Sequence, residues 1–198
     1  MARFRASTGV CGGLVLLSLA AIDCRATSAA DPLEAAAGHY VIERGSEIDF
    51  MVAQIGGGGI RGRFPDFSGT FDIMAHDFSK SRVDFTISPA SVAANQPRIT
   101  NFLKSSAVFD AADFPVIRFR SFRVERTGPE SARIDGMLTA KGRTLTQSFT
   151  ASLVHLDGGG IAFHVVGSVY RAAYGMEIGV PIYSNVVRFD MMLKGHRS

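Results

Sequence analysis

Apolar and polar residues alternate with a period of two along most of the chain from His39 onward. For example, Ile48, Phe50 and Val52 alternate with the less apolar positions between them. Such alternation indicates a strand with one buried face and one exposed face. The pattern predicts about eight strands, over residues 48–53, 67–73, 83–88, 117–120, 134–138, 145–153, 161–169 and 187–193.

Turn-forming residues separate these strands, as in a series of hairpins. The turns are expected at residues 56–59, 127–129, 141–142 and 157–160. One stretch, residues 98–114, departs from the alternation, and a short helix over 101–104 is expected there. Antiparallel strands with one exposed face must close on themselves or pair as a sandwich. We therefore expect an all-β fold, an eight-stranded antiparallel barrel with a short helical insertion near residues 98–108.

The first thirty residues have the three-part pattern of a secretory signal peptide. Arg3 and Arg5 precede an apolar run, Val10–Ile22, and small residues follow it. A membrane-spanning helix needs about 20 apolar residues, which is more than this run contains. We predict export, with cleavage near Ala29 or Ala30, and an uncleaved anchor is the alternative.

After the signal peptide (residues 1–30), we expect a short leader at 31–38 and a barrel domain at 39–198. Residues 31–198 carry 18 basic and 17 acidic residues, because three arginines and one aspartate lie before them. Nucleic-acid binding requires a clear surplus of positive charge, so nucleic acid is not an expected partner. Both cysteines, Cys11 and Cys24, lie in the first thirty residues, so the domain has no thiolate nucleophile or thiolate metal ligand.

Motifs for catalysis or metal binding are weak in this chain. Gly57, Gly59 and Gly62 match the spacing of a dinucleotide fingerprint, but no helical pattern follows them. They are better interpreted as a flexible hairpin or lid loop. His155 and His164 could approach each other across a hairpin, but two imidazoles without a third ligand do not predict a metal site. We expect no enzyme activity, no cofactor and no metal.

Phenylalanine is unusually frequent, with 15 residues and no tryptophan, mostly at inward-facing strand positions. An interior of this composition is either a packed core or an apolar ligand cavity, and composition does not separate the two. The predicted cavity wall consists of Phe50, Val52, Phe71, Phe85, Ile87, Phe119, Leu138, Phe149, Phe163, Val165 and Phe189.

Eight short motifs also occur in a characteristic order. They are SEIDF (46–50), GRF (62–64), FSGTFD (67–72), LKS (103–105), FD (109–110), FPVIRF (114–119), GMLTAKGRT (136–144) and YRAAYGM (170–176). Together they resemble the YceI family of exported bacterial lipid-binding proteins. The resemblance implies a lipocalin-like barrel that encloses a polyisoprenoid or similar long-chain amphiphile in the periplasm, without catalysis.

The chain departs from the family pattern at two places. The helical insertion usually carries an acidic residue and a histidine where this chain has Thr100 and Phe102, and a histidine common at the end of the first strand is replaced near Gln54. These changes remove polar groups that could contact a ligand head group. Our hypothesis for that contact is Arg98 or Arg171, with structural salt bridging as the alternative role.

The sequence thus predicts a periplasmic carrier of an isoprenoid lipid, such as a quinone or a polyprenyl phosphate. A homodimer and transient membrane contact are further partner hypotheses. One alternative is an enzyme acting on a lipid-like substrate inside the barrel, although no base or nucleophile is indicated. The other is an eight-stranded outer-membrane barrel, in which Arg118, Arg120, Arg123 and Arg188 would be costly toward lipid.

Overall fold

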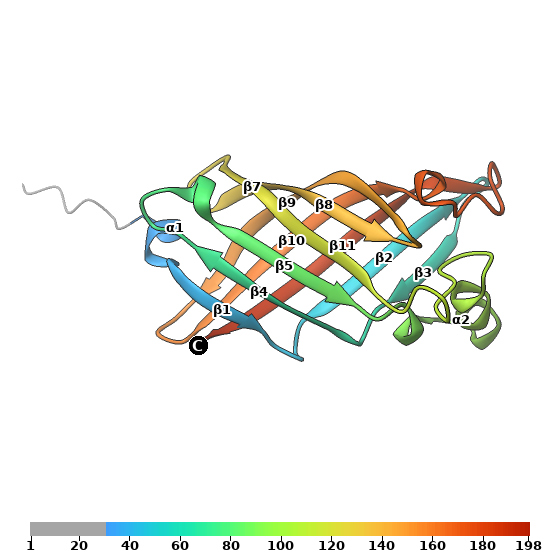
Figure 1. The fold of residues 1–198 in the computed structure, drawn as a ribbon, viewed down its shortest axis with the longest axis horizontal. Coiled ribbons are helices and arrows are strands. Elements are labelled where there is room, and N and C mark those ends of the chain that lie inside the picture. Colours follow the sequence, from blue (N-terminus) through green and yellow to red (C-terminus); the bar gives the residue numbers. More distant parts are fainter. Residues whose placement is uncertain (1–30) are drawn as a thin grey trace, which may run out of the picture.

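The barrel is built from antiparallel strands, and the computed structural model describes residues 31–198 of the chain (Figure 1). The strands are β1 (Gly38–Ile42), β2 (Glu47–Gln54), β3 (Gly59–Arg63), β4 (Phe67–Ile73), β5 (Arg82–Ile87), β6 (Ala93–Ala94), β7 (Ile117–Arg126), β8 (Ser131–Ala140), β9 (Arg143–Leu156), β10 (Gly160–Tyr170) and β11 (Tyr183–Arg197). The α-helices are α1 (Pro32–Ala35) and α2 (Pro97–Lys104), and the 3₁₀ helices are η1 (Phe78–Lys80), η2 (Pro89–Ser91) and η3 (Arg171–Tyr174).

Eight strands close the barrel in the order β1-β4-β5-β7-β8-β9-β10-β11, and β11 pairs back onto β1. This confirms the predicted eight-stranded antiparallel fold. Strands β2, β3 and β6 extend the sheet from β11. The long strand β11 pairs with β2 over Tyr183–Met192 and with β1 over Gly195–Arg197, so β1 and β2 continue one wall of the barrel.

The eight predicted strands correspond to β2, β4, β5, β7, β8, β9, β10 and β11. Strands β1, β3 and β6 were not predicted. Strand β3 has the sequence GIRGR, in which two glycines and two arginines leave a single apolar side chain, and β6 has only two residues. The expected helix at 101–104 lies within α2. Within residues 31–198, no helix combines the length and apolar composition that a membrane-crossing helix requires.

The segment 31–38 belongs to the folded domain, which corrects its interpretation as a leader. The Asp31 side chain caps α1 by accepting a hydrogen bond from the Leu33 amide at 3.1 Å, and it also pairs with Arg126 of β7. Leu33 and Ala36 are buried, so α1 covers one end of the barrel interior (Figure 1). The predicted signal peptide, residues 1–30, lies outside the described residues.

The glycine run 56–59 forms the turn between β2 and β3. Gly56, Gly57 and Gly58 have positive φ angles of 86°, 104° and 76°. At Gly59, φ is 137° and a Cβ atom would lie 2.2 Å from the Val52 carbonyl oxygen, so a larger residue does not fit. Strand β3 begins at Gly59, and the dinucleotide fingerprint therefore lacks the helix it requires.

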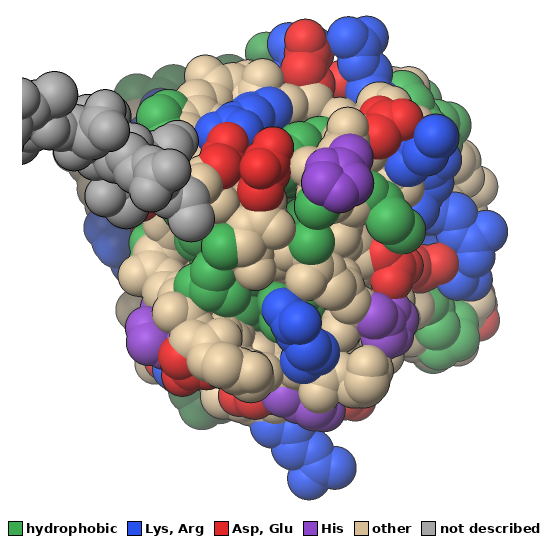
Figure 2. All heavy atoms as spheres, turned by 90° about the vertical axis from the view of Figure 1, so that its left-hand side faces the viewer, with side chains coloured by type: hydrophobic (Ala, Val, Ile, Leu, Met, Phe, Trp, Pro, Cys, Tyr) green, Lys and Arg blue, Asp and Glu red, His purple; other side chains and the backbone are tan. Residues whose placement is uncertain are grey.

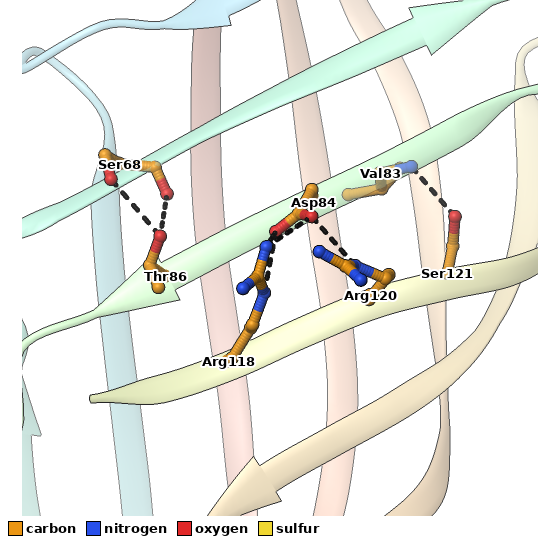
Figure 3. A network of polar contacts seen from close by, with 7 residues as sticks. All are labelled: Ser68, Val83, Asp84, Thr86, Arg118, Arg120 and Ser121. Carbon is orange, nitrogen blue, oxygen red and sulfur yellow. Dashed lines mark hydrogen bonds and ion pairs between the residues drawn. The ribbon is translucent and has the colours of Figure 1, made fainter.

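The outer wall of the barrel carries a network of charged side chains (Figure 3). The Asp84 carboxylate on β5 accepts hydrogen bonds from Arg118 at 2.8 Å and from Arg120 at 3.0 Å, both on β7. The hydrogen bonds from Arg118 hold the pKa of Asp84 below its ordinary value, against the opposing effect of partial burial. Charge therefore lies outside and apolar side chains inside, the reverse of the distribution expected for the outer-membrane alternative.

Candidate functional site

A cavity of about 300 Å³ runs through the barrel from the α1 end to the α2 end. Its wall includes Leu33 of α1 and Phe78 of η1 at one end, and Phe102 of α2 at the other. Eleven of the fifteen phenylalanines line it. The volume falls within the range of small-molecule binding sites, so the interior is hollow rather than filled.

All eleven residues predicted for the cavity wall line this cavity. They are Phe50, Val52, Phe71, Phe85, Ile87, Phe119, Leu138, Phe149, Phe163, Val165 and Phe189. They come from eight strands, because one side chain in two faces inward along each strand. Their role in binding a ligand stays a prediction.

Glycines on neighbouring strands explain why the aromatic rings leave the lumen open. A Cβ atom on Gly167 would lie 2.3 Å from Phe149 Cδ1, and one on Gly136 would lie 2.4 Å from Phe119 Cζ. The same arrangement recurs for the pairs Gly62 with Phe50 and Gly69 with Phe85, and the Phe71 ring lies against Gly195 two strands away, across β1. Each ring therefore lies over the backbone at a glycine, in space that a side chain would otherwise occupy.

The rings also contact one another along the wall. Phe149 packs edge-on against Phe119 at 5.2 Å and against Phe189 at 6.4 Å between ring centroids. Phe50 continues the series, 6.3 Å from Phe189 and 5.2 Å from Phe64. Edge-to-face pairs, such as the two made by Phe149, stabilise a protein by about 0.5–1.5 kcal/mol each beyond their burial. The series holds the rings in place around the lumen.

The cavity opens at the α2 end. Among the described wall residues, only Phe102 and Ile178 are exposed, at 37% and 49%. Phe102 belongs to α2, and Ile178 to the segment that joins η3 to β11, and these segments lie at the same end of the barrel (Figure 1). We call this opening the mouth.

Polar wall residues already have partners within the protein. Asp72 pairs with His39, and the Ser81 hydroxyl accepts a hydrogen bond from the Met74 amide at 3.1 Å. At the mouth end, the Tyr174 hydroxyl accepts one from Gln147 at 3.3 Å, and burial raises the pKa of Tyr174. These groups lie near the two ends, so the middle of the cavity is apolar.

Arg171 is the other charged residue on the described wall, besides Asp72, and it is only 7% exposed. Four of its N–H groups donate to backbone carbonyls, those of Met176, Ile178 (2.9 Å), Tyr183 (3.2 Å) and Ser184 (2.9 Å). Burial lowers the pKa of Arg171. Its structural role is therefore to order the segment 175–184 through carbonyl groups, rather than the salt bridging considered from the sequence.

The two arginines proposed for head-group contact differ in position. Arg171 lies on the cavity wall near the mouth, whereas Arg98 is exposed on α2 and is not a wall residue. A guanidinium group has five N–H donors. Four N–H groups of Arg171 donate to backbone carbonyls, so one N–H group stays available to a ligand. Head-group contact by Arg171 stays a prediction, and the position of Arg98 gives it no support.

The histidines considered for a metal site interact with separate carboxylates. His155 lies 3.1 Å from Asp157, and His164 lies 2.8 Å from Asp190. Across residues 31–198, no group of three or more histidine, cysteine, aspartate or glutamate side chains is placed to hold a metal ion.

Positions that depart from the family pattern lie around the mouth. The Thr100 hydroxyl accepts a hydrogen bond from the Ala94 amide at 3.0 Å and so ties α2 to β6. Phe102 lines the mouth, and Gln54 is exposed at the end of β2, opposite Tyr183. An aromatic ring thus occupies a mouth position where the family pattern has a polar residue.

A closed antiparallel barrel around an apolar cavity, open at one end, is the architecture of barrel proteins that enclose a ligand. The model of the YceI-like domain matches residues 40–194. The chain belongs to the YceI family.

Relatives and solved structures agree with this assignment. A UPF0312 protein of Shewanella baltica (strain OS185) is 29% identical over 175 residues, which cover 84% of this chain and 91% of that protein. BcnA of Burkholderia cenocepacia has a similar fold, with a TM-score of 0.72 at 20% identity, covering 77% of this chain and 98% of that one. A polyisoprenoid binding domain from Saccharophagus degradans gives a TM-score of 0.65 at 14% identity, covering 82% and 99%.

Proposed function

We propose that this protein is a periplasmic carrier that sequesters the chain of a polyisoprenoid or a similar long-chain amphiphile inside its barrel. The observation that carries the proposal is the apolar cavity, covered by α1 at one end and open at the mouth. The neighbour described as a polyisoprenoid binding domain has the same fold, which supports this class of ligand.

The energetics of the cavity favour selection by chain length. Burying one methylene group contributes about 0.8 kcal/mol, so a five-carbon isoprene unit contributes at most roughly 3–4 kcal/mol. Non-covalent affinities saturate near about 18–21 kcal/mol, which a handful of units would approach. The depth of the cavity, measured from the mouth to Leu33, therefore limits the length of chain that can be accommodated.

The head group is expected to stay at the mouth. Burying an unpaired polar group costs several kcal/mol, and the middle of the cavity offers it no donor. Arg171, Tyr174 and Tyr183 lie on the wall at the mouth end, and Arg171 carries a positive charge there. This arrangement suits an anionic head group, such as a phosphate, better than a neutral one.

Lipid binding can be tested by extracting the purified protein with organic solvent, identifying lipids by mass spectrometry, and titrating the delipidated protein with geranylgeraniol. Val165→Phe fills the lumen and should weaken binding, whereas Val166→Phe on the same strand faces outward and should not. Thermal unfolding checks that both variants fold. No copurified lipid and no binding at micromolar concentration would contradict the proposal.

Export can be tested by fractionating cells and sequencing the N-terminus of the mature protein. Cleavage near Ala29 or Ala30 should leave a mature chain that begins at Ala30 or Asp31 in the periplasmic fraction. Recovery of uncleaved protein in the cytoplasm would overturn the periplasmic assignment. A homodimer stays a prediction, which light scattering tests.

A further inference from the structure

Exposed apolar side chains cluster beside the mouth. Ile55, Ile178, Val180 and Ile182 are exposed at 71%, 49%, 45% and 58%. Ile55 lies at the tip of the turn between β2 and β3, and the other three lie in the segment between η3 and β11. We call these four residues the mouth patch.

Backbone contacts hold the mouth patch together and join it to the cavity. The Ile55 amide donates a hydrogen bond to the Ile182 carbonyl at 2.9 Å, and the Tyr183 amide donates to the Gly179 carbonyl at 2.8 Å. Ile178 belongs to both the mouth patch and the cavity wall. An apolar surface therefore continues from outside the protein into the lumen.

The two ends of the barrel differ in charge. Loops at the α1 end (31–37, 74–81, 127–130 and 157–159) contain five acidic residues and one basic residue. Segments at the mouth end (55–58, 64–66, 88–116, 141–142 and 171–182) contain four acidic and four basic residues. Figure 2 shows the α1 end, where charged and histidine side chains surround small hydrophobic areas.

Ion pairs show the same asymmetry. Those of the described residues lie on the barrel wall or toward the α1 end, as for Asp31 with Arg126, and none involves the mouth-end segments. A surface approaching the mouth therefore meets aliphatic side chains without having to separate paired charges. An anionic surface is repelled by the α1 end and not by the mouth end.

We propose that the mouth patch docks the barrel on an anionic lipid bilayer, so that the ligand passes between bilayer and cavity without crossing water. This inference rests on the proposed lipid carrier function. Aliphatic side chains at loop tips suit shallow insertion among lipid head groups, and Ile178 then leads the apolar chain into the lumen. Docking elsewhere on the barrel would leave the mouth facing water.

The test compares the purified native protein with the triple variant Ile55→Ser/Val180→Ser/Ile182→Ser, none of whose positions lines the cavity. Sedimentation with vesicles of phosphatidylethanolamine and phosphatidylglycerol that contain geranylgeraniol measures docking and uptake together. Three exposed aliphatic side chains are lost, so vesicle affinity should fall roughly tenfold, with slower uptake. Affinity for farnesol added from solution should be unchanged.

A matched control carries the same substitution on the outer wall, Met137→Ser/Val154→Ser, where the native side chains are exposed at 39% and 53%. The control should bind vesicles like the native protein. The docking proposal is overturned if the triple variant binds vesicles as well as the native protein does, or if the control loses as much vesicle affinity as the triple variant. Absence of vesicle binding by the native protein would also overturn it. Absence of farnesol binding by the native protein would instead overturn the carrier function itself.

Discussion

The pairing of glycine with phenylalanine makes the width of the cavity sensitive to a single methyl group. Gly167 on β10 lies directly opposite Phe149 on β9. In Gly167→Ala, the new Cβ would lie 2.3 Å from Phe149 Cδ1, whereas ordinary contact begins at 3.4 Å. The ring must therefore move by about 1.1 Å, the difference between these distances, and the free direction is toward the lumen.

The displacement should affect both stability and binding. Overpacking of this kind typically costs about 1–3 kcal/mol in the free energy of unfolding. Phe149 also packs against Phe119 and Phe189, so its neighbours resist the movement. A ring shifted into the lumen displaces about one to two methylene groups of ligand, at about 0.8 kcal/mol each, which corresponds to roughly 4- to 15-fold weaker binding.

Displacement of the fluorescent fatty acid cis-parinaric acid by geranylgeraniol measures this change, and urea unfolding measures stability. The double variant Gly167→Ala/Phe149→Leu restores space and should recover most of the affinity. Gly45→Ala is the control, because nothing lies within 4 Å of that Cβ position. Native affinity in Gly167→Ala, or an equal loss in Gly45→Ala, would refute the idea that glycine sets the cavity width.

Three further predictions concern single side chains. Arg171→Lys should lower the free energy of unfolding by about 3 kcal/mol in urea titrations, because an ammonium group cannot serve four carbonyls arranged for a guanidinium. Asp84→Asn should destabilise by less than about 1 kcal/mol near pH 7. The folded-state pKa of Asp84 is lowered from 3.8, so this difference should vanish as pH falls below that range, and a gap that persists in acid would contradict it. Phe102→Asp should weaken geranylgeraniol binding several-fold with little change in melting temperature, since the ring is partly exposed at the mouth.

Period-two alternation was sufficient to predict the barrel because most wall strands bury one face and expose the other. It missed β3, where Gly62 accommodates the ring of Phe50 and Gly59 lies against the Val52 carbonyl, so the strand has no alternating apolar pattern. It also missed α1, because a four-residue helix with one buried leucine has no detectable period. Short elements depend on tertiary contacts, such as that between Asp31 and Arg126, which a linear pattern does not contain.

The residues of the cavity wall could be predicted from the sequence, whereas the free space that they enclose could not. Inward-facing positions follow from strand periodicity, but the free space depends on which residue lies across each ring on the next strand. Glycines opposite phenylalanines, as in Gly167 with Phe149, were the available signal, and reading it requires the strand register. Arg171 was found as a candidate, but its backbone partners depend on the path of a segment without regular structure.

The asymmetry of the barrel ends has a consequence for exchange of the ligand. At the α1 end, Leu33 is almost fully buried and the helix is held by Asp31 and Arg126, so opening that end requires breaking part of the fold. At the mouth, Phe102 and Ile178 are already exposed, and Arg171 keeps the segment around Ile178 ordered. Entry and release should therefore share one route, and substitutions at the mouth should change exchange rates more than substitutions in α1. Faster release from Leu33→Ala than from Ile178→Ser would show that the ligand leaves through the α1 end.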